Sequence, residues 1–107
     1  MNETSENWIK VAEQAAVAPG AVVGGKAGDL DIALYNIDGQ FYATDNICTH
    51  AHALLSDGWL EGGIIECPLH GGSFEVKTGK GVTAPITCDL RTFAVRVQGN
   101  DIEVKVA

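Results

Sequence analysis

The stretch DIALYNIDGQFYAT (residues 31–44) carries the clearest fold signal in this chain of 107 residues. Apolar and polar residues alternate on both sides of Asp38-Gly39, and an Asp-Gly pair between two such segments is typical of a β-hairpin. A second hairpin is predicted over TFAVRVQGNDIEVKV (92–106), where every second residue of each half is apolar. The two hairpins indicate antiparallel sheet structure.

The rest of the chain fits the same class of fold. Weaker strands are predicted at WIKVA (8–12), AVVGG (21–25), GIIEC (63–67) and SFEVK (73–77), with one helical turn within 12–20. Thirteen glycines suit many tight turns, and no repeat, linker or long helical period interrupts the pattern. We therefore expect a single all-β domain over residues 1–107, built from two antiparallel sheets.

Composition and charge exclude several classes of protein. Apolar residues make up 46% of the chain, which is typical of a globular domain. The net charge of −7 argues against nucleic acid as a partner, because phosphate contacts need basic side chains. No run of 18 apolar residues predicts a membrane span, and the N-terminus MNETSENWIK lacks the features of a signal peptide. A cytoplasmic protein without structural disulfides is expected.

The chain has three cysteines and three histidines, and five of these six residues lie in two short segments, CTHAHALL (48–55) and CPLH (67–70). Each segment lies between predicted strands and offers one thiolate and one imidazole, as Cys48-x-His50 and Cys67-x2-His70. A tetrahedral zinc ion accepts such donors, but zinc fingers usually pair Cys with Cys and His with His. A two-metal cluster resolves the spacing, with both cysteines on one iron and both histidines on the other. That is the ligand set of a Rieske [2Fe–2S] centre.

The elements CTH, CPLHGGSF and the proline of TAP (83–85) resemble Rieske ferredoxins, specifically the small ferredoxin components of bacterial aromatic-ring-hydroxylating dioxygenases. The string YATDNICTHAHALLSDGWLEGGIIECPLHGGSFEVKTGK (42–80) is similar to that family nearly throughout. The resemblance implies the Rieske fold, an antiparallel β-sandwich with a small cluster-binding subdomain at about 45–80 formed by two loops. It also implies one [2Fe–2S] cluster, bound by Cys48 and Cys67 on the buried iron and by His50 and His70 on the outer iron.

The resemblance also implies a function. The family carries electrons one at a time from an NAD(P)H-dependent flavoprotein ferredoxin reductase to a terminal oxygenase in aromatic hydrocarbon catabolism. The chain is then a carrier and not itself an enzyme, since 107 residues leave no room for a mononuclear iron domain. A monomer is expected, because a shuttle must show one face to two partners. The alternatives are the Rieske-like small subunit of a complex such as an assimilatory nitrite reductase, a zinc module, or a binding domain without metal.

Several further residues are open to two interpretations. Cys88 is expected to be a thiol outside the ligand set, and His52 a surface histidine beside the cluster. Trp59 is predicted to pack in the core rather than to conduct an electron. Leu54, Leu55 and Leu69 would exclude water from the cluster. The carboxylates of Asp45, Asp57, Glu61 and Glu66 could steer a partner or only confer solubility. Ser73 has no motif of a catalytic nucleophile.

Overall fold

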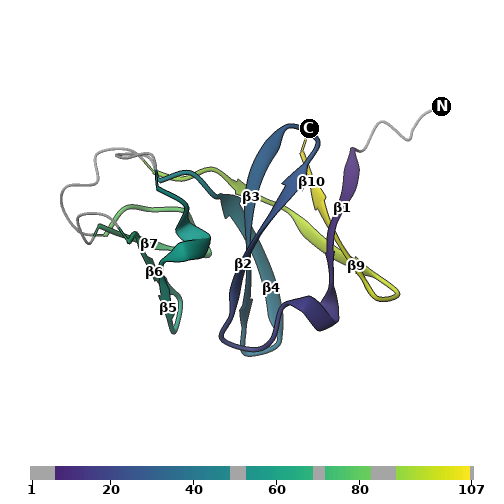
Figure 1. Cartoon of the computed structure of the whole chain (residues 1–107), viewed down its shortest axis with the longest axis horizontal. Coiled ribbons are helices and arrows are strands. Elements are labelled where there is room, and N and C mark those ends of the chain that lie inside the picture. The colour runs from purple at the N-terminus through teal and green to yellow at the C-terminus, as the bar shows by residue number, and fades with distance from the viewer. Residues whose placement is uncertain (1–6, 49–52, 69–71, 83–88, 107) are drawn as a thin grey trace.

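The computed structural model describes residues 7–48, 53–68, 72–82 and 89–106, and in these ranges it is almost entirely antiparallel β-structure (Figure 1). The strands form three sheets. A three-stranded sheet has the order β1 (Trp8–Glu13), β10 (Asp101–Lys105), β9 (Val95–Gln98). A four-stranded sheet has the order β2 (Val22–Ala27), β3 (Leu30–Ile37), β4 (Gln40–Asp45), β8 (Thr92–Phe93). A small sheet has the order β5 (Trp59–Glu61), β6 (Ile64–Glu66), β7 (Ser73–Glu75).

The hairpin predicted over residues 31–44 is confirmed as β3 and β4. Ile37 pairs with Gln40 across the turn, and both turn residues have positive φ, 54° at Asp38 and 89° at Gly39. These dihedrals match the two-residue turn whose twist suits a hairpin, and they explain the Asp-Gly pair. The helical turn expected within residues 12–20 is the 3₁₀ helix η1 (Gln14–Ala16).

The second predicted hairpin is only partly correct. β9 and β10 pair as expected around Gly99, whose φ is 61°. However, residues 92–98 do not form one strand, because β8 pairs with β4 in the four-stranded sheet while β9 pairs with β10 in the three-stranded sheet. The chain therefore crosses from one sheet to the other at Ala94, and this crossing joins the two layers of the sandwich.

Strand β3, inside the four-stranded sheet, is buried on both faces. Alternate residues of β3 enter two separate clusters: Ile32 and Leu34 enter one, Ala33 and Tyr35 the other. We call the first the sandwich core, which contains Val17, Ala27, Ile32, Leu34, Ala43, Ile102 and Val104. We call the second the loop core, which contains Ala33, Tyr35, Cys48, Ala53, Leu55, Ile65, Cys67, Phe74, Val76 and Leu90. Because successive side chains of a strand point to opposite faces, one strand supports both cores.

The small sheet lies on the opposite side of β2, β3 and β4 from β1 and β9 (Figure 1). Its central row, Leu60, Ile65 and Phe74, faces the loop core, where Ile65 and Phe74 are fully buried. The sequence indicated β6 and β7 but not β5, so the third sheet was missed. β5 has only three residues and follows Gly58, where an added Cβ would collide with the carbonyl oxygen of Glu66. No helix in the described ranges is both long and apolar enough to cross a membrane.

Candidate metal centre

Two of the four predicted metal ligands lie within the described residues, and the fold brings them to the same core. Cys48 comes after β4 and Cys67 directly after β6, and both side chains are buried in the loop core. No disulfide joins them. His50 and His70 lie outside the described residues, as do His52, Leu69, Pro85 and Cys88. The structure therefore places the two predicted sulfur donors in one buried cluster.

Each cysteine stands at the base of a loop that closes in the same way. The Cys48 N–H donates to the Ala53 carbonyl at 2.9 Å, and the Cys67 N–H donates to the Gly72 carbonyl at 2.7 Å. In each case the acceptor lies five positions along the chain, and a predicted histidine ligand falls between donor and acceptor. Two segments far apart in the sequence are thus closed by hydrogen bonds of the same spacing, and the donor of each is a buried cysteine.

A buried amide fixes the first loop. Asn46 accepts the Ser56 N–H on Oδ1 at 2.8 Å and donates from Nδ2 to Ser56 Oγ at 3.0 Å. The Leu55 N–H also donates to the Asn46 carbonyl at 2.8 Å, so the chain before Cys48 is joined to the chain after Ala53. Our reading of the sequence missed Asn46. Its one sequence signal is a short polar residue directly after a strand, which is also common in turns.

A third segment is tied to the same region through residues 89–91. The Leu90 N–H donates to the Gly79 carbonyl at 2.7 Å, and Asp89 Oδ1 accepts the Gly81 N–H at 3.0 Å. Arg91 donates two hydrogen bonds to the carboxylate of Asp45, from Nε to Oδ2 at 3.0 Å and from a terminal nitrogen to Oδ1 at 2.9 Å. The hydrogen bonds that Arg91 donates to Asp45 raise the pKa of the Arg91 guanidinium. Asp45 therefore has a structural partner and does not join the acidic side chains that face solvent.

The loop core also holds a neutral phenol. Tyr35 is fully buried, and its hydroxyl lies 2.9 Å from Thr44 Oγ1, which in turn donates to the Asp45 carbonyl at 2.8 Å. Burial raises the pKa of Tyr35, because the phenolate would lose its hydration. The hydroxyl is thus protonated at neutral pH and its hydrogen bond is local, so it organises the end of β4.

Large apolar side chains are exposed around the two loops. Ile47 precedes Cys48 and forms an isolated bridge with Leu54, and Val82 ends the described segment after β7. Leu55 is fully buried as predicted, but Leu54 is exposed. The prediction that Trp59 packs in the core is wrong, since its side chain is 60% exposed. Leu60 takes the inward position of β5, and strand alternation therefore turns Trp59 outward.

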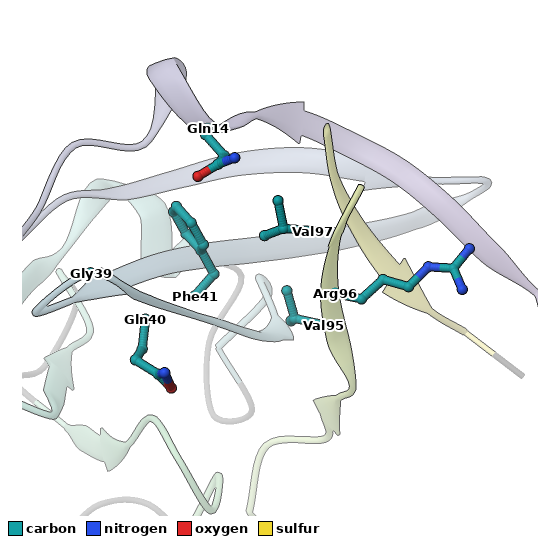
Figure 2. Close-up of a pocket in the computed structure, with 7 residues that line it drawn as sticks. All are labelled: Gln14, Gly39, Gln40, Phe41, Val95, Arg96 and Val97. Atoms are coloured by element: carbon teal, nitrogen blue, oxygen red, sulfur yellow. The ribbon is translucent and has the colours of Figure 1, made fainter. Parts of the chain in front are cut away.

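A cavity of about 310 Å³ lies away from the cysteines, between β4 and β9 (Figure 2). Its lining is apolar or uncharged except for one guanidinium, and consists of Gln14, Gly39, Gln40, Phe41, Val95, Arg96 and Val97. None of these residues is a thiol, an imidazole or a carboxylate, so the cavity offers no nucleophile or general base. The chemistry-bearing side chains lie at the other end of β4, beside the loops.

The chain is similar in sequence to known proteins over most of its length. Residues 7–94 match the sequence pattern of the Rieske [2Fe–2S] domain family. The chain is 46% identical over 102 residues to the ferredoxin component of the naphthalene 1,2-dioxygenase/salicylate 5-hydroxylase systems of Ralstonia sp.. That similarity covers 95% of this chain and 98% of the relative.

Solved structures share the fold. One chain of the complex of reduced oxygenase and oxidised ferredoxin in carbazole 1,9a-dioxygenase is similar with a TM-score of 0.85 and 40% identity, over 92% of this chain and 93% of that one. The small subunit of an NADH-dependent nitrite reductase from Mycobacterium tuberculosis has a TM-score of 0.84 over 95% of this chain and 96% of its own. Its identity is only 21%, so that likeness concerns the fold alone.

Proposed function

The chain belongs to the Rieske [2Fe–2S] domain family, and we propose that it is the ferredoxin component of an aromatic-ring dioxygenase system. In this role it carries one electron at a time from an NAD(P)H-dependent flavoprotein reductase to a terminal oxygenase. It performs no substrate chemistry, in keeping with relatives that are named as ferredoxin components. The whole chain acts as one cytoplasmic, monomeric domain.

The residues present fit an iron–sulfur cofactor. Cys48 and Cys67 are buried at the bases of two equivalently closed loops, which suits sulfur ligands of an inner iron. His50 and His70, each within one of those loops by sequence, would hold the outer iron. When bound, the cluster supplies a one-electron redox couple. Leu55, Phe74 and Val76 keep water from the sulfur side, because all three are buried in the same core.

The observation that carries the proposal is the pair of buried cysteines, each at the hydrogen-bonded closure of a loop, with exposed apolar side chains nearby. Ile47, Leu54 and Val82 leave large apolar side chains exposed next to the loops, and such a surface suits a small, transient contact between redox partners. A carrier that leaves each partner after one electron needs an interface of this kind rather than a large obligate one. The related complex of oxygenase and ferredoxin supports the oxygenase as one partner.

The nearest alternative is the small subunit of a nitrite reductase, which shares the fold at low identity. Reoxidation by partner proteins separates the two functions. We expect the reduced protein to be reoxidised by a terminal oxygenase of the naphthalene 1,2-dioxygenase type and not by a nitrite reductase large subunit. Reoxidation by the latter alone would favour the alternative.

Low-temperature electron paramagnetic resonance after dithionite reduction tests the cofactor and its ligands. A rhombic signal with an average g below that of all-cysteine [2Fe–2S] proteins is expected, since two imidazoles replace two thiolates. Cys67→Ser should abolish the signal, while Cys88→Ser should keep it. An electron paramagnetic resonance-silent protein that contains zinc would overturn the electron-transfer function and indicate a structural metal site.

A further inference from the structure

The outer face of the small sheet presents an aromatic ring beside a carboxylate. Trp59 on β5 pairs directly with Glu66 on β6, while the next pair, Leu60 and Ile65, faces the loop core. Because side chains alternate between the faces of a strand, Trp59 and Glu66 both project outward, and directly opposite side chains lie about 5 Å apart at Cβ. The third pair, Glu61 and Ile64, also projects outward.

The exposure of Trp59 is unusual for its size. With 60% of its surface accessible, it is the most exposed of the large apolar side chains in the described ranges. Tryptophan is normally well buried, and a mainly exposed indole keeps a large apolar area in water at a cost in stability. Exposed tryptophans that serve no core are enriched among the residues that dominate binding at protein interfaces.

The charges on this face are not neutralised from within the described part of the chain. The ion pairs there engage Glu13, Asp31, Asp45, Asp101 and Glu103. None of them engages Asp57, Glu61 or Glu66, although all three of these side chains are exposed. The outer face of β5 and β6 therefore combines an exposed ring with net negative charge.

We propose that this face, made of Trp59, Glu61 and Glu66, docks an arginine-bearing surface of the terminal oxygenase. The inference rests on the proposed function and adds to it a second contact area beside the loops. A guanidinium can stack on the Trp59 indole and donate hydrogen bonds to the Glu66 carboxylate at the same time, which an ammonium group does less well.

Position and charge favour this occupant over others. Glu66 directly precedes Cys67, so a partner held at this face also lies next to the second loop. A second copy of the chain would bring like charges together, as would nucleic acid. The oxygenase is the partner class that a related ferredoxin contacts in a solved complex.

Binding of the reduced and oxidised holoprotein to a purified terminal oxygenase of a naphthalene 1,2-dioxygenase system tests the proposal. We expect Trp59→Ala to raise Kd on the order of tenfold, and Trp59→Phe to retain most of the affinity. Glu66→Gln should raise Kd severalfold and reduce its dependence on salt. Asp38→Asn is the matched control, because it removes an exposed charge at the opposite end of β4 and should leave Kd unchanged. The visible spectrum should be the same in all four variants, and the reduction potential should be unchanged in Trp59→Ala, Trp59→Phe and Asp38→Asn.

The outcomes separate this inference from the function on which it rests. Wild-type affinity and salt dependence in Trp59→Ala and Glu66→Gln would overturn the docking face and leave the carrier function intact. A loss of affinity for the flavoprotein reductase alone would equally contradict the assignment to the oxygenase. Failure of the wild-type protein to bind or reduce the oxygenase would instead overturn the proposed function. If Trp59→Ala does not fold, the proposal is tested by the other two variants: Glu66→Gln should weaken binding and reduce its salt dependence, and Trp59→Phe should retain most of the affinity.

Discussion

The sandwich core and the loop core share strand β3 but differ in what holds them together. The sandwich core contains only hydrocarbon side chains, and all of them except Val17 come from strands of five to eight residues. The loop core contains two thiols and a phenol and is covered by strands of three residues. The first can form from strand pairing and apolar burial alone. The second closes around loops, and we expect its stability to depend on the metal that those loops would hold.

The difference between the two cores shows how a small domain can hold a redox group near its surface. A site that must come near the surface needs loops, and loops bury little apolar area. Here the loops lie on a sheet whose other face is packed in the sandwich core, so their small buried area is supported by the rest of the domain. Changes confined to one core should therefore affect the stability of that core more than the stability of the other.

Removal of iron should have the largest effect. In the apo-protein, or in Cys67→Ser, we expect amides of β6 and β7 to lose their protection from hydrogen exchange, while amides of β10 stay protected. The reason is that the thiols lie in the loop core only. Hydrogen exchange read by mass spectrometry on peptides covering 59–75 and 95–106 measures both regions. Equal loss of protection in the two peptides would mean that the cores are one cooperative unit.

Truncation of one buried side chain in each core should come next in size. Phe74→Ala and Ile102→Ala each remove a fully buried side chain, at a cost of about 3–5 and 2–5 kcal/mol respectively. Phe74→Ala should also lower the iron content, whereas Ile102→Ala should unfold more easily yet keep its iron. Urea unfolding and iron analysis check both statements. Val97→Ala, at an exposed position, is the control. Iron loss in Ile102→Ala at low temperature would contradict the division.

The neighbouring glycines of β2 offer a finer test, since each faces a different core. A Cβ on Gly24 would lie 2.8 Å from Asn46 Nδ2 and 2.9 Å from Ser56 Oγ, beside the first loop. A Cβ on Gly25 would lie 2.5 Å from Val11 Cγ1, within the sandwich. Substitution by alanine at either position should cost about 1–3 kcal/mol through overpacking.

The two alanine variants should differ in their spectra. Gly24→Ala pushes on the Asn46–Ser56 hydrogen bonds and should broaden or shift the electron paramagnetic resonance signal, while Gly25→Ala should leave it unchanged. Gly63→Ala is the control, because no atom lies within 4 Å of its added Cβ. Identical spectra for Gly24→Ala and the wild type would show that the amide does not position the loop.

Tyr35 should give the smallest effect, one that depends on pH. Burial raises the pKa of Tyr35 above its value in the unfolded chain. The protonated hydroxyl therefore adds its full contribution to the free energy of unfolding below about pH 10, and this contribution declines as the pH rises further. Tyr35→Phe should cost about 1 kcal/mol at neutral pH through the lost hydrogen bond to Thr44, and should flatten the alkaline decline. Urea unfolding between pH 7 and 11 measures this. Tyr42→Phe, which keeps that hydrogen bond, should retain the decline.

The sequence predicted the features that depend on neighbours along the chain. The turn at Asp38 and Gly39 is local chemistry, since the Asp-Gly pair and the alternation on either side specify the hairpin without help from the rest of the fold. The two cysteines could be assigned to loops for the same reason, because each follows a recognisable strand. The spacing also predicts that Cys48, His50, Cys67 and His70 bind one cofactor.

Features that depend on distant segments were missed or wrongly predicted. Trp59 was expected inside because tryptophan usually is, but the fold gives the inward position to Leu60. The residues 92–98 looked like one strand, yet partners from two sheets divide them at Ala94. The pairing of Asn46 with Ser56 spans a loop and leaves no periodic trace in the sequence.

The sequence was enough to predict an all-β protein of the Rieske family, and it also predicts that two Cys/His segments bind the metal cluster. Tertiary contacts were needed to show that β3 serves two cores, that Cys48 and Cys67 each donate to a carbonyl five positions later, and that an indole and carboxylates face solvent. The physical reason is range: turn dihedrals and strand alternation act between neighbouring residues, whereas burial is set by whichever distant segment covers a face.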